Sequence, residues 1–361
     1  MRVLQVVTDN DRRGAQVFGA HLHDALRARG HDVETVAMVE GASGGLGFPV
    51  LGRRWPSPTI LRRLRARMGG ADVTVAHGSD TGLACALAGI GRRRYVYRQI
   101  SDSAFWTPTR LKRARSRFGM NRAAAVVALS EFNRTQLVET IGVEPGKIVV
   151  VPNGVPGSRF TPPTAEERRA ARVALGVPDG PIVLSVGALT PEKGTALVVA
   201  SVARIPDVHL VVAGAGPERE RLEAQARAEA PERVHFVGNR PDAGELYRAA
   251  DVLALASRGG DSMPAVLLEA GLCALATVST RIGAIPEVIV DGSTGLVVDP
   301  DDPVALAEAV TALLGDPPRR ARMGAAARER CLTRYEMTPV AEEWESVLRR
   351  VARTGSVSRR R

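Results

Sequence analysis

Short apolar runs that alternate with helical patterns constrain the fold of this chain more than any other feature. The first run spans residues 3–7, and it is followed by a polar loop around Gly14 and a helical pattern over 16–29. A nearly continuous apolar run of this length is typical of a strand buried on both faces, as in a parallel sheet. Gly30 ends the helical pattern and a second apolar run covers 33–39, so the segment predicts the start of a doubly wound parallel sheet.

The same alternation continues along the whole chain and is interrupted once, by a Pro-rich polar stretch after residue 154. The sequence therefore predicts an α/β protein with two Rossmann-like, doubly wound parallel-sheet domains. Because ligands bind at the carboxyl ends of the strands in such sheets, we expect the domains to face an interdomain cleft. The further apolar runs are 73–76, 95–97, 125–129, 148–151, 182–186, 210–213, 234–237 and 252–256.

Length and texture give the expected domain boundaries. A chain of 361 residues is long enough for two domains that each bury a core. We expect an N-terminal domain over 1–160, a linker over 161–178 and a C-terminal domain over 179–335. An amphipathic helix over 339–352 is expected to pack back on the first domain, and 354–361 reads as a flexible, Arg-rich tail.

Several function classes are excluded by simple counts. The longest apolar runs are far shorter than the roughly 20 residues that span a bilayer, and the N-terminus resembles a strand more than a secretion signal. The three cysteines, Cys85, Cys273 and Cys331, are widely spaced, which argues against a disulfide framework and against a zinc site. We therefore expect a cytoplasmic protein.

Positive charge is concentrated in the first part of the chain. Residues 1–160 contain 24 Lys and Arg against 12 Asp and Glu, whereas the remainder contains 25 against 27. The excess falls mostly in 53–67 and 92–122, and such patches attract anionic partners. The alternative is a solvated face in a chain that prefers Arg to Lys, and the sequence does not decide between the two.

The segment after the run 252–256 carries the most informative chemistry. Asp261 and Ser262 stand where a helix N-cap belongs, and Pro264 stands in the first turn. From residue 263 onward the helix is apolar on every side except at Glu269.

A single carboxylate in such a helix requires a partner. Burying Glu269 in an apolar helix costs free energy unless a donor bonds to it, and two vicinal ribose hydroxyls can do so at once. The helix N-terminus would offer free amides to phosphate or sugar oxygens. The alternative is that Asp261 is a plain cap and that Glu269 pairs with an arginine such as Arg281.

From residue 183 to 298 the chain strongly resembles the donor-binding domain of family 4 retaining glycosyltransferases (glycosyl transferases group 1), which have the GT-B fold. The first half resembles the family more weakly, through the short motifs at 13–15, 29–31, 128–130 and 151–154. The matching motifs of the second half, in the family's order, are 186–194, 212–217, 234–238, 261–269, 283–288 and 291–295.

The resemblance implies a role for individual residues. Glu269 would hold the donor ribose, Asp261 would touch the transferred sugar, and Lys193 would bind the diphosphate. Gly14, Lys193 and Asp261 are the implied catalytic positions. The implied donor-binding positions are Gly14, Ala15, Gly187, Lys193, Gly214, Val237, Asp261, Ser262, Met263, Pro264 and Glu269.

Three positions depart from the family pattern. Ala188 stands where many relatives have an arginine, and Asp261 stands where most have glutamate. Some relatives place a histidine in the loop that here reads 98–102, so no catalytic histidine carries over. His77, Arg98 and Asp102 remain as candidates on the acceptor side, although a structural role is the simpler interpretation of His77.

The resemblance implies a hexosyltransferase that uses a UDP-sugar or a GDP-sugar and needs neither cofactor nor metal. The basic first half suggests an anionic acceptor, either a phospho-polyol or a lipid-linked glycan reached from the inner leaflet of the plasma membrane, with 110–122 as a helix on the bilayer. A soluble secondary metabolite as acceptor, and an epimerase or hydrolase of sugar nucleotides, remain alternatives. A nucleic-acid-binding protein would suit the sequence pI near 10.4, but aromatic residues are only 4% and no nucleic-acid motif is present.

Overall fold

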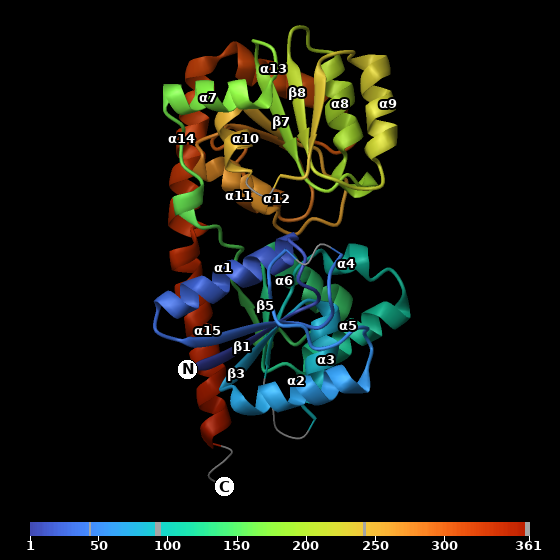
Figure 1. Cartoon of the computed structure of the whole chain (residues 1–361), viewed down its shortest axis with the longest axis vertical. Coiled ribbons are helices and arrows are strands. Elements are labelled where there is room, and N and C mark those ends of the chain that lie inside the picture. The colour runs from blue at the N-terminus through green and yellow to red at the C-terminus, as the bar shows by residue number, and fades with distance from the viewer. Residues whose placement is uncertain (43–44, 91–94, 241–242, 358–361) are drawn as a thin grey trace. The chain divides into compact units, whose positions relative to one another are not determined.

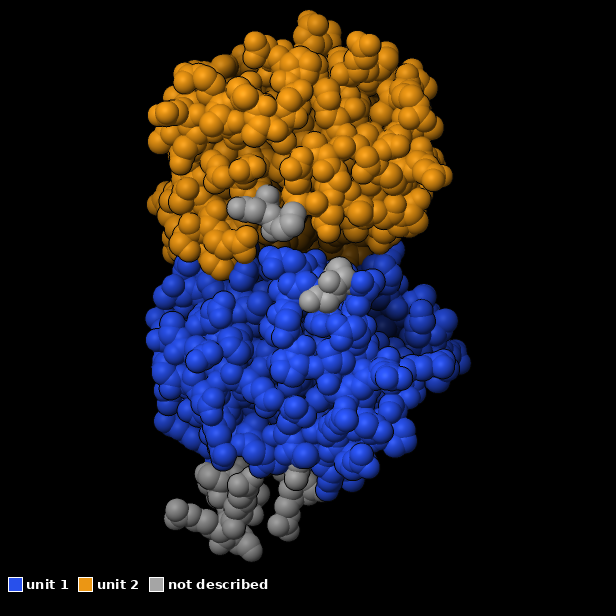
Figure 2. Space-filling view, viewed as in Figure 1, with its two compact units in different colours: residues 1–155, 336–361 blue, residues 156–335 orange. Residues whose placement is uncertain are grey.

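The computed structural model describes residues 1–42, 45–90, 95–240 and 243–357. The chain forms two compact units, which Figure 2 colours blue and orange. Unit 1 contains Met1–Val155 and Glu336–Arg361, and unit 2 is the continuous segment Pro156–Tyr335. Each unit contains its own sheet and its own buried core, so we describe them one at a time.

Unit 1 is a parallel sheet with helices on both faces (Figure 1). Its six described strands lie in the order β2-β1-β3-β4-β5-β6. The strands are β1 (Arg2–Val7), β2 (Asp32–Ala37), β3 (Val73–His77), β4 (Tyr95–Arg98), β5 (Ala125–Ala128) and β6 (Ile148–Val150). The helices are α1 (Gly14–Ala28), α2 (Pro58–Gly70), α3 (Ser79–Ala88), α4 (Ser103–Trp106), α5 (Arg110–Arg122), α6 (Glu131–Gln136) and α15 (Met337–Val357).

The apolar residues of β1, which are interrupted only by Gln5, are explained by the two covered faces of the strand. Val3 packs in a cluster with Leu22 of α1 and Trp344 of α15, whereas Leu4 packs in a second cluster with Leu64 of α2. Successive side chains of a strand point to opposite faces, so both Val3 and Leu4 need an apolar neighbour. The two clusters confirm the parallel, doubly covered sheet that the sequence predicted.

The last helix of the chain belongs to unit 1, as the sequence predicted for 339–352. Trp344 is completely buried, and Glu345 accepts a hydrogen bond from Arg29 at 2.7 Å and lies 3.1 Å from the His31 ring. The bonds from Arg29 and Arg349 lower the pKa of Glu345 to about 2, so this carboxylate stays ionised. The helix continues to Val357, so it includes part of the predicted flexible tail, and 358–361 lie outside the described residues.

Unit 2 is also a six-stranded parallel sheet in its described part, but its strands follow one another in a different order. Its six described strands lie in the order β12-β11-β10-β7-β8-β9 and pair in parallel. They are β7 (Ile182–Val186), β8 (His209–Ala213), β9 (Val234–Gly238), β10 (Val252–Leu255), β11 (Thr277–Thr280) and β12 (Leu296–Val298). The helices are α7 (Ala165–Leu175), α8 (Thr195–Ala203), α9 (Arg219–Glu229), α10 (Gly244–Ala249), α11 (Ala265–Leu272), α12 (Ile285–Val288), α13 (Pro303–Gly315) and α14 (Pro317–Arg334).

The stretch expected to be a linker, 161–178, contains helix α7 and lies in unit 2. Thr164 and Glu167 form a capping box at its start. Arg168 and Arg172 each approach the carboxylate of Asp251 to 2.6 Å, which ties the helix to the strand end at Ile182. The unit boundary is therefore at Val155/Pro156, and the Pro-rich texture marks the approach to a helix of unit 2.

Within the residues that the structure describes, no helix is both long enough and apolar enough to cross a bilayer.

Candidate active site

Lys193 and Asp261, two of the predicted donor residues, lie in loops at the point where the strand order of unit 2 reverses. β7 is the first strand of this sheet, β8 and β9 follow on one side of it, and β10 is its neighbour on the other. The loops after β7 and β10 therefore diverge at the carboxyl ends of adjacent strands. In open α/β sheets this reversal point is the usual ligand-binding crevice.

A glycine brings the two loops into contact. Lys193 ends a short 3-10 turn after β7, and Gly194 follows it with a φ of +65°. A Cβ on Gly194 would lie 1.9 Å from the carbonyl oxygen of Ala256, which directly follows β10. Only glycine permits both this φ and this approach, so the residue after Lys193 sets the position of the loop.

Lys193 and Asp261 form an ion pair across 68 positions of sequence. The second carboxylate oxygen of Asp261 accepts a hydrogen bond from the Ser257 hydroxyl. Asp261 is 7% exposed, and the Lys193 side chain is 26% exposed. The structure thus joins two of the residues that the resemblance singled out, and it leaves the ammonium group partly open to a ligand.

The expectation that Asp261 caps the following helix was wrong. Helix α11 begins at Ala265, and its N-cap residue, Pro264, makes no side-chain capping bond. The Asp261 carboxylate is already engaged by Lys193 and Ser257, which explains why it does not turn toward the helix. Asp261, Ser262 and Met263 are all buried in the loop that leads to α11.

Glu269 lies in the middle of α11 and accepts a hydrogen bond from the Tyr247 hydroxyl of α10 at 2.6 Å. Burial raises the pKa of Glu269, while the bond from Tyr247 and the charge of Arg159 oppose that rise. The Tyr247 ring is itself held edge-on by Phe160, with 5.8 Å between ring centroids. Among the described residues one side chain, Tyr247, donates to this carboxylate, which has capacity for several more hydrogen bonds.

The alternative pairing of Glu269 with Arg281 does not occur. The guanidinium of Arg281 lies 3.5 Å from Asp299 in an exposed pair. Sequence reasoning missed Tyr247 as the actual partner. Its only signal was a tyrosine on a short helix, and the register between α10 and α11 that joins the two side chains is a tertiary property.

The two glycines of the predicted donor site after β7 and β8 differ in whether packing requires the absence of a side chain. Gly214 has a φ of +146°, and a Cβ there would lie 1.8 Å from the Gly187 carbonyl oxygen, so close packing of the loops after β7 and β8 explains it. A Cβ on Gly187 itself would meet no atom within 4 Å. Val237 lies in β9 and is partly buried. Packing therefore explains why residue 214 is glycine, but it does not explain why residue 187 is glycine.

Arg258 is a further residue that sequence reasoning missed. Its backbone amide donates to the Glu192 carbonyl at 2.8 Å, and its side chain passes 3.4 Å from the Cβ position of Gly194. The side chain is 52% exposed and pairs with the exposed Asp301. An exposed cation thus adjoins the Lys193 loop in a chain that has alanine at position 188.

In unit 1, Gly14 begins α1 directly after the loop that follows β1, and Ala15 is in its first turn. β1 and β3 are the strands at which the order of this sheet reverses. A Cβ on Gly14 would meet no atom within 4 Å, and its φ is not in the left-handed region. As with Gly187, neither strain nor packing accounts for the glycine.

His77 and Arg98, two of the acceptor-side candidates, lie in a buried network. Each is 1% exposed. The His77 ring contacts Gln5 at 2.9 Å and Arg98 at 3.4 Å, and Arg98 also donates to Asn153 at 2.6 Å. Burial and the charge of Arg98 hold the pKa of His77 well below its usual range. Both side chains have structural partners, in keeping with the simpler interpretation of His77.

The third acceptor-side candidate, Asp102, is an N-cap. One of its carboxylate oxygens accepts hydrogen bonds from the backbone amides of Ala104 and Phe105 at 2.9 and 3.1 Å. Asp102 is 8% exposed. It shapes the start of α4, and this helix lies beside a pocket described below.

Comparison with protein families gives two matches that together span most of the chain. Residues 12–159 match the model described as Glycosyltransferase Family 4, and residues 167–330 match the model described as Glycosyl transferases group 1. The first match covers most of the N-terminal segment of unit 1 and the first four residues of unit 2, and the second match lies within unit 2.

Comparison with individual proteins agrees with these two family matches. A GDP-mannose-dependent alpha-(1-6)-phosphatidylinositol monomannoside mannosyltransferase of Mycolicibacterium smegmatis is 33% identical over 302 residues, 78% of each chain. A D-inositol 3-phosphate glycosyltransferase of Xylanimonas cellulosilytica is 36% identical over 56% of this chain and 52% of its own. The fold matches the Anabaena protein HepE, crystallised with UDP and glucose, with a TM-score of 0.88 and 21% identity over 96% of this chain and 99% of that one.

Proposed function

The chain belongs to glycosyltransferase family 4, and from that premise we propose that it is a retaining enzyme whose nucleoside-diphosphate-sugar donor binds at the reversal point of unit 2. The observation that carries the proposal is the contact between the Lys193 ammonium and the Asp261 carboxylate across the β7 and β10 loops. A cation and a hydrogen-bond acceptor at one crevice suit a ligand that carries both phosphate and sugar hydroxyls.

The proposed contacts assign one part of the donor to each residue. Glu269 accepts from the two ribose hydroxyls, Lys193 binds the diphosphate, and Asp261 accepts from a hydroxyl of the transferred sugar. Arg258 supplies a second cation in place of an arginine at 188. Gly187 and Gly14, where a Cβ would meet open space, are positions at which a ligand can approach the backbone closely.

In the proposed reaction the acceptor hydroxyl oxygen bonds to C1 of the sugar while the bond from C1 to the phosphate oxygen breaks. Attack occurs on the face from which the diphosphate departs, and a phosphate oxygen takes the hydroxyl proton. Negative charge therefore grows on the departing diphosphate. Lys193 is placed to stabilise that charge, and positioning of the two substrates supplies the rest.

The names of the relatives reduce the number of candidate donors and acceptors. The M. smegmatis relative uses GDP-mannose, and HepE was crystallised with UDP, so UDP-sugars and GDP-sugars are the donors to test. The two enzymes named above act on a phosphatidylinositol monomannoside and on an inositol phosphate. Together with the basic charge of residues 1–160, these names support an anionic acceptor.

A thermal-shift screen followed by product analysis tests the function. We expect one nucleoside diphosphate and its sugar conjugate to raise the unfolding temperature, since a ligand that binds only the folded state stabilises it. Transfer should require acceptor, with little free nucleotide released in its absence. Rapid release without acceptor would identify a hydrolase, and no stabilisation by any sugar nucleotide would contradict the proposal.

We further propose that the exposed face of α4 and α5 contacts anionic membranes. Phe105, Trp106 and Leu111 are 46%, 47% and 82% exposed, and α5 carries six basic residues and no acid. Exposed apolar side chains among cations are the features that bind an anionic lipid surface. Ser116, Gly119 and Met120 attach the opposite face of α5 to unit 1.

Co-sedimentation with anionic vesicles at low salt tests this surface. Leu111→Ser should lower the vesicle partition coefficient at least about tenfold, because transfer of a leucine side chain out of water is worth about 1.5–3 kcal/mol. Val173→Ser is the matched control, since Val173 is 77% exposed on unit 2. Equal binding of both variants and the unaltered chain, or no binding by any of them, would rule the membrane contact out.

A further inference from the structure

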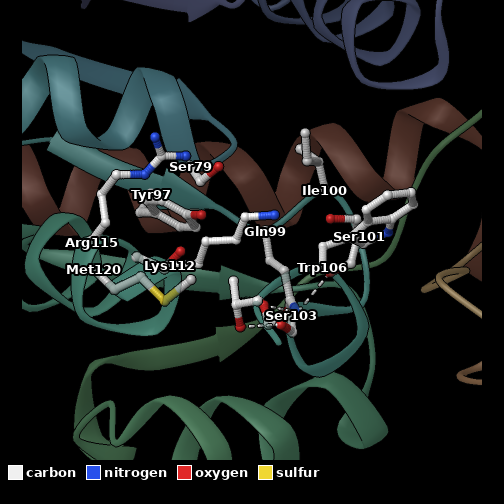
Figure 3. Close-up of a pocket in the computed structure, with 12 residues that line it drawn as sticks. Ser79, Tyr97, Gln99, Ile100, Ser101, Ser103, Trp106, Lys112, Arg115 and Met120 are labelled. Atoms are coloured by element: carbon white, nitrogen blue, oxygen red, sulfur yellow. Dashed lines mark hydrogen bonds between the residues drawn. The ribbon is translucent and has the colours of Figure 1, made fainter. Parts of the chain in front are cut away.

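A pocket of about 290 Å³ opens at the carboxyl end of β4 in unit 1. Figure 3 shows it between the segment that follows β4 and the helix α5, with α4 at one side. The volume is at the lower end of the range for small-molecule sites, which suits a ligand of about the size of one monosaccharide. The carboxyl ends of strands are also where this architecture binds ligands.

The side chain of Tyr97 lines the floor of the pocket. Tyr97 is 3% exposed. The ring lies so close to α3 that a Cβ on Gly82 would be 2.4 Å from it. Burial and the charge of Asp80 raise the pKa of Tyr97, so the hydroxyl remains protonated and can donate.

A second polar group on the floor is incompletely bonded. The amide nitrogen of Gln99 donates to the Ser101 carbonyl at 3.0 Å and to the Ser103 hydroxyl at 2.9 Å. Because the Ser101 carbonyl can only accept, this orientation of the amide is settled, and the amide oxygen is left without a partner in the described part of the chain. Buried polar groups are nearly always hydrogen-bonded, so the floor is prepared for a hydroxylated ligand or for water.

The rim of the pocket is cationic. Lys112 and Arg115 are three positions apart on α5, so they lie on the same side of the helix. The Arg115 guanidinium is 3.2 Å from Asp80, whereas the Lys112 ammonium contacts no acid among the described residues. Two cations against one carboxylate leave a net positive charge at the rim.

We propose that this pocket binds the acceptor and that the acceptor is a polyol phosphate, with its hydroxyls against Tyr97 and Gln99 and its phosphate against Lys112 and Arg115. The inference rests on the proposed transferase function and names the substrate class of its acceptor site. Hydroxyl groups that both donate and accept suit a polyol on the floor. A phosphate at the rim, which has several oxygens that accept hydrogen bonds, can contact both cations at once.

Two sources can supply this chemistry, a free polyol phosphate or the headgroup of a lipid. With the cations at the rim, the phosphate of either remains near the surface while the ring of hydroxyls enters the pocket. Trp106 lines the pocket and is 47% exposed, so the rim adjoins the surface that we propose to contact membranes.

Calorimetric titration of the full chain with polyol phosphates tests the pocket. The probes are glycerol 3-phosphate, glucose 6-phosphate and myo-inositol 1-phosphate, each beside its unphosphorylated polyol. We expect at least one phosphate to bind and its neutral partner to bind at least tenfold more weakly. Vesicles that contain phosphatidylinositol form a separate arm, and displacement of the bound phosphate by these vesicles but not by phosphatidylserine vesicles would identify the lipid headgroup as the source.

Variants of the lining residues test whether the phosphate binds in this pocket. Lys112→Gln should weaken binding of the phosphate, and raise its KM in transfer, about 10- to 100-fold, and Tyr97→Phe about tenfold. Arg117→Gln is the control, because it removes one charge from the same helix without lining the pocket. It should leave both values within about twofold.

Failure of this inference can be told apart from failure of the proposed function. If Lys112→Gln and Tyr97→Phe match the unaltered chain while nucleotide-dependent transfer proceeds, the acceptor binds elsewhere and the inference is overturned. Equal binding of phosphate and neutral polyol, or no binding of any probe or vesicle, overturns it too. If instead no nucleotide stabilises the protein, the proposed function has failed whatever the pocket binds.

Discussion

Replacement of Lys193 by alanine is expected to lower kcat about 10²- to 10³-fold, which is the usual cost of removing one group that stabilises charge formed in the transition state. The KM for the donor should rise less, since the diphosphate gains most of its charge as the bond to the sugar breaks. Lys193→Arg should recover part of the rate because it keeps the charge while changing its geometry. Steady-state rates with the donor identified in the thermal screen measure all three enzymes.

The chain offers a matched control for this change. It contains only three lysines, and Lys147 donates to the backbone carbonyl of Asn121 in unit 1. Lys147→Ala should leave kcat within about twofold. The Asp261 carboxylate keeps its bond from Ser257 when Lys193 is removed, so Lys193→Ala should also unfold near the temperature of the unaltered protein. A folded Lys193→Ala enzyme with nearly full kcat would remove Lys193 from the proposed chemistry.

Replacement of Glu269 by glutamine is expected to weaken binding of the donor nucleotide about 10- to 100-fold. A carboxylate can accept from both ribose hydroxyls, whereas an amide has one oxygen that accepts and a nitrogen that only donates. Hydrogen bonds to charged groups are worth about 1.5–3 kcal/mol each, which gives the expected range. Calorimetric titration with the nucleoside diphosphate measures the effect.

The same variant should make the free protein more stable at neutral pH. Burial raises the pKa of Glu269 in the folded state, so ionisation of this carboxyl costs folding free energy as the pH rises from 4.5 through the raised pKa. Glutamine accepts from Tyr247 without that cost. Stability and nucleotide affinity should therefore change in opposite directions, which is the mark of a residue retained for binding.

Glu308→Gln is the control for both measurements, because Glu308 is exposed on α13 of the same unit. It should alter neither the unfolding temperature nor the nucleotide affinity. If Glu269→Gln lowered the unfolding temperature and left nucleotide affinity unchanged, Glu269 would be a structural partner of Tyr247 and the donor site would lie elsewhere.

Sequence patterns predicted the fold well because they record local requirements. The apolar run of β1 reflects its two covered faces. Glu269 stands out because it is the single acid in a helical segment that is otherwise apolar on every side. Both features can be read without knowing which segments meet in space. The first is confirmed, and the role of Glu269 remains a prediction.

The errors arose where distant residues decide the local structure. The 161–178 stretch looked like a linker because α7 buries little apolar surface of its own, with Ala171 its one buried residue. Its attachment is the ion pair with Asp251, some 80 positions away. Likewise Asp261 had the sequence context of a cap, but Lys193 and Ser257 engage it first.

The path of the chain between the units has a consequence for truncation. The chain leaves unit 1 after Val155 and returns at Glu336, and the Met337 amide donates to the Val155 carbonyl at 3.1 Å, so exit and re-entry are adjacent. Unit 2 is thus an insertion held at both ends by a single point of unit 1. Shortening the protein from its C-terminus would remove Val351, Leu348 and then Trp344 from the core of unit 1, the unit whose strands are synthesised first. The core of unit 1 therefore cannot be completed until unit 2 and the helix α15 have been synthesised.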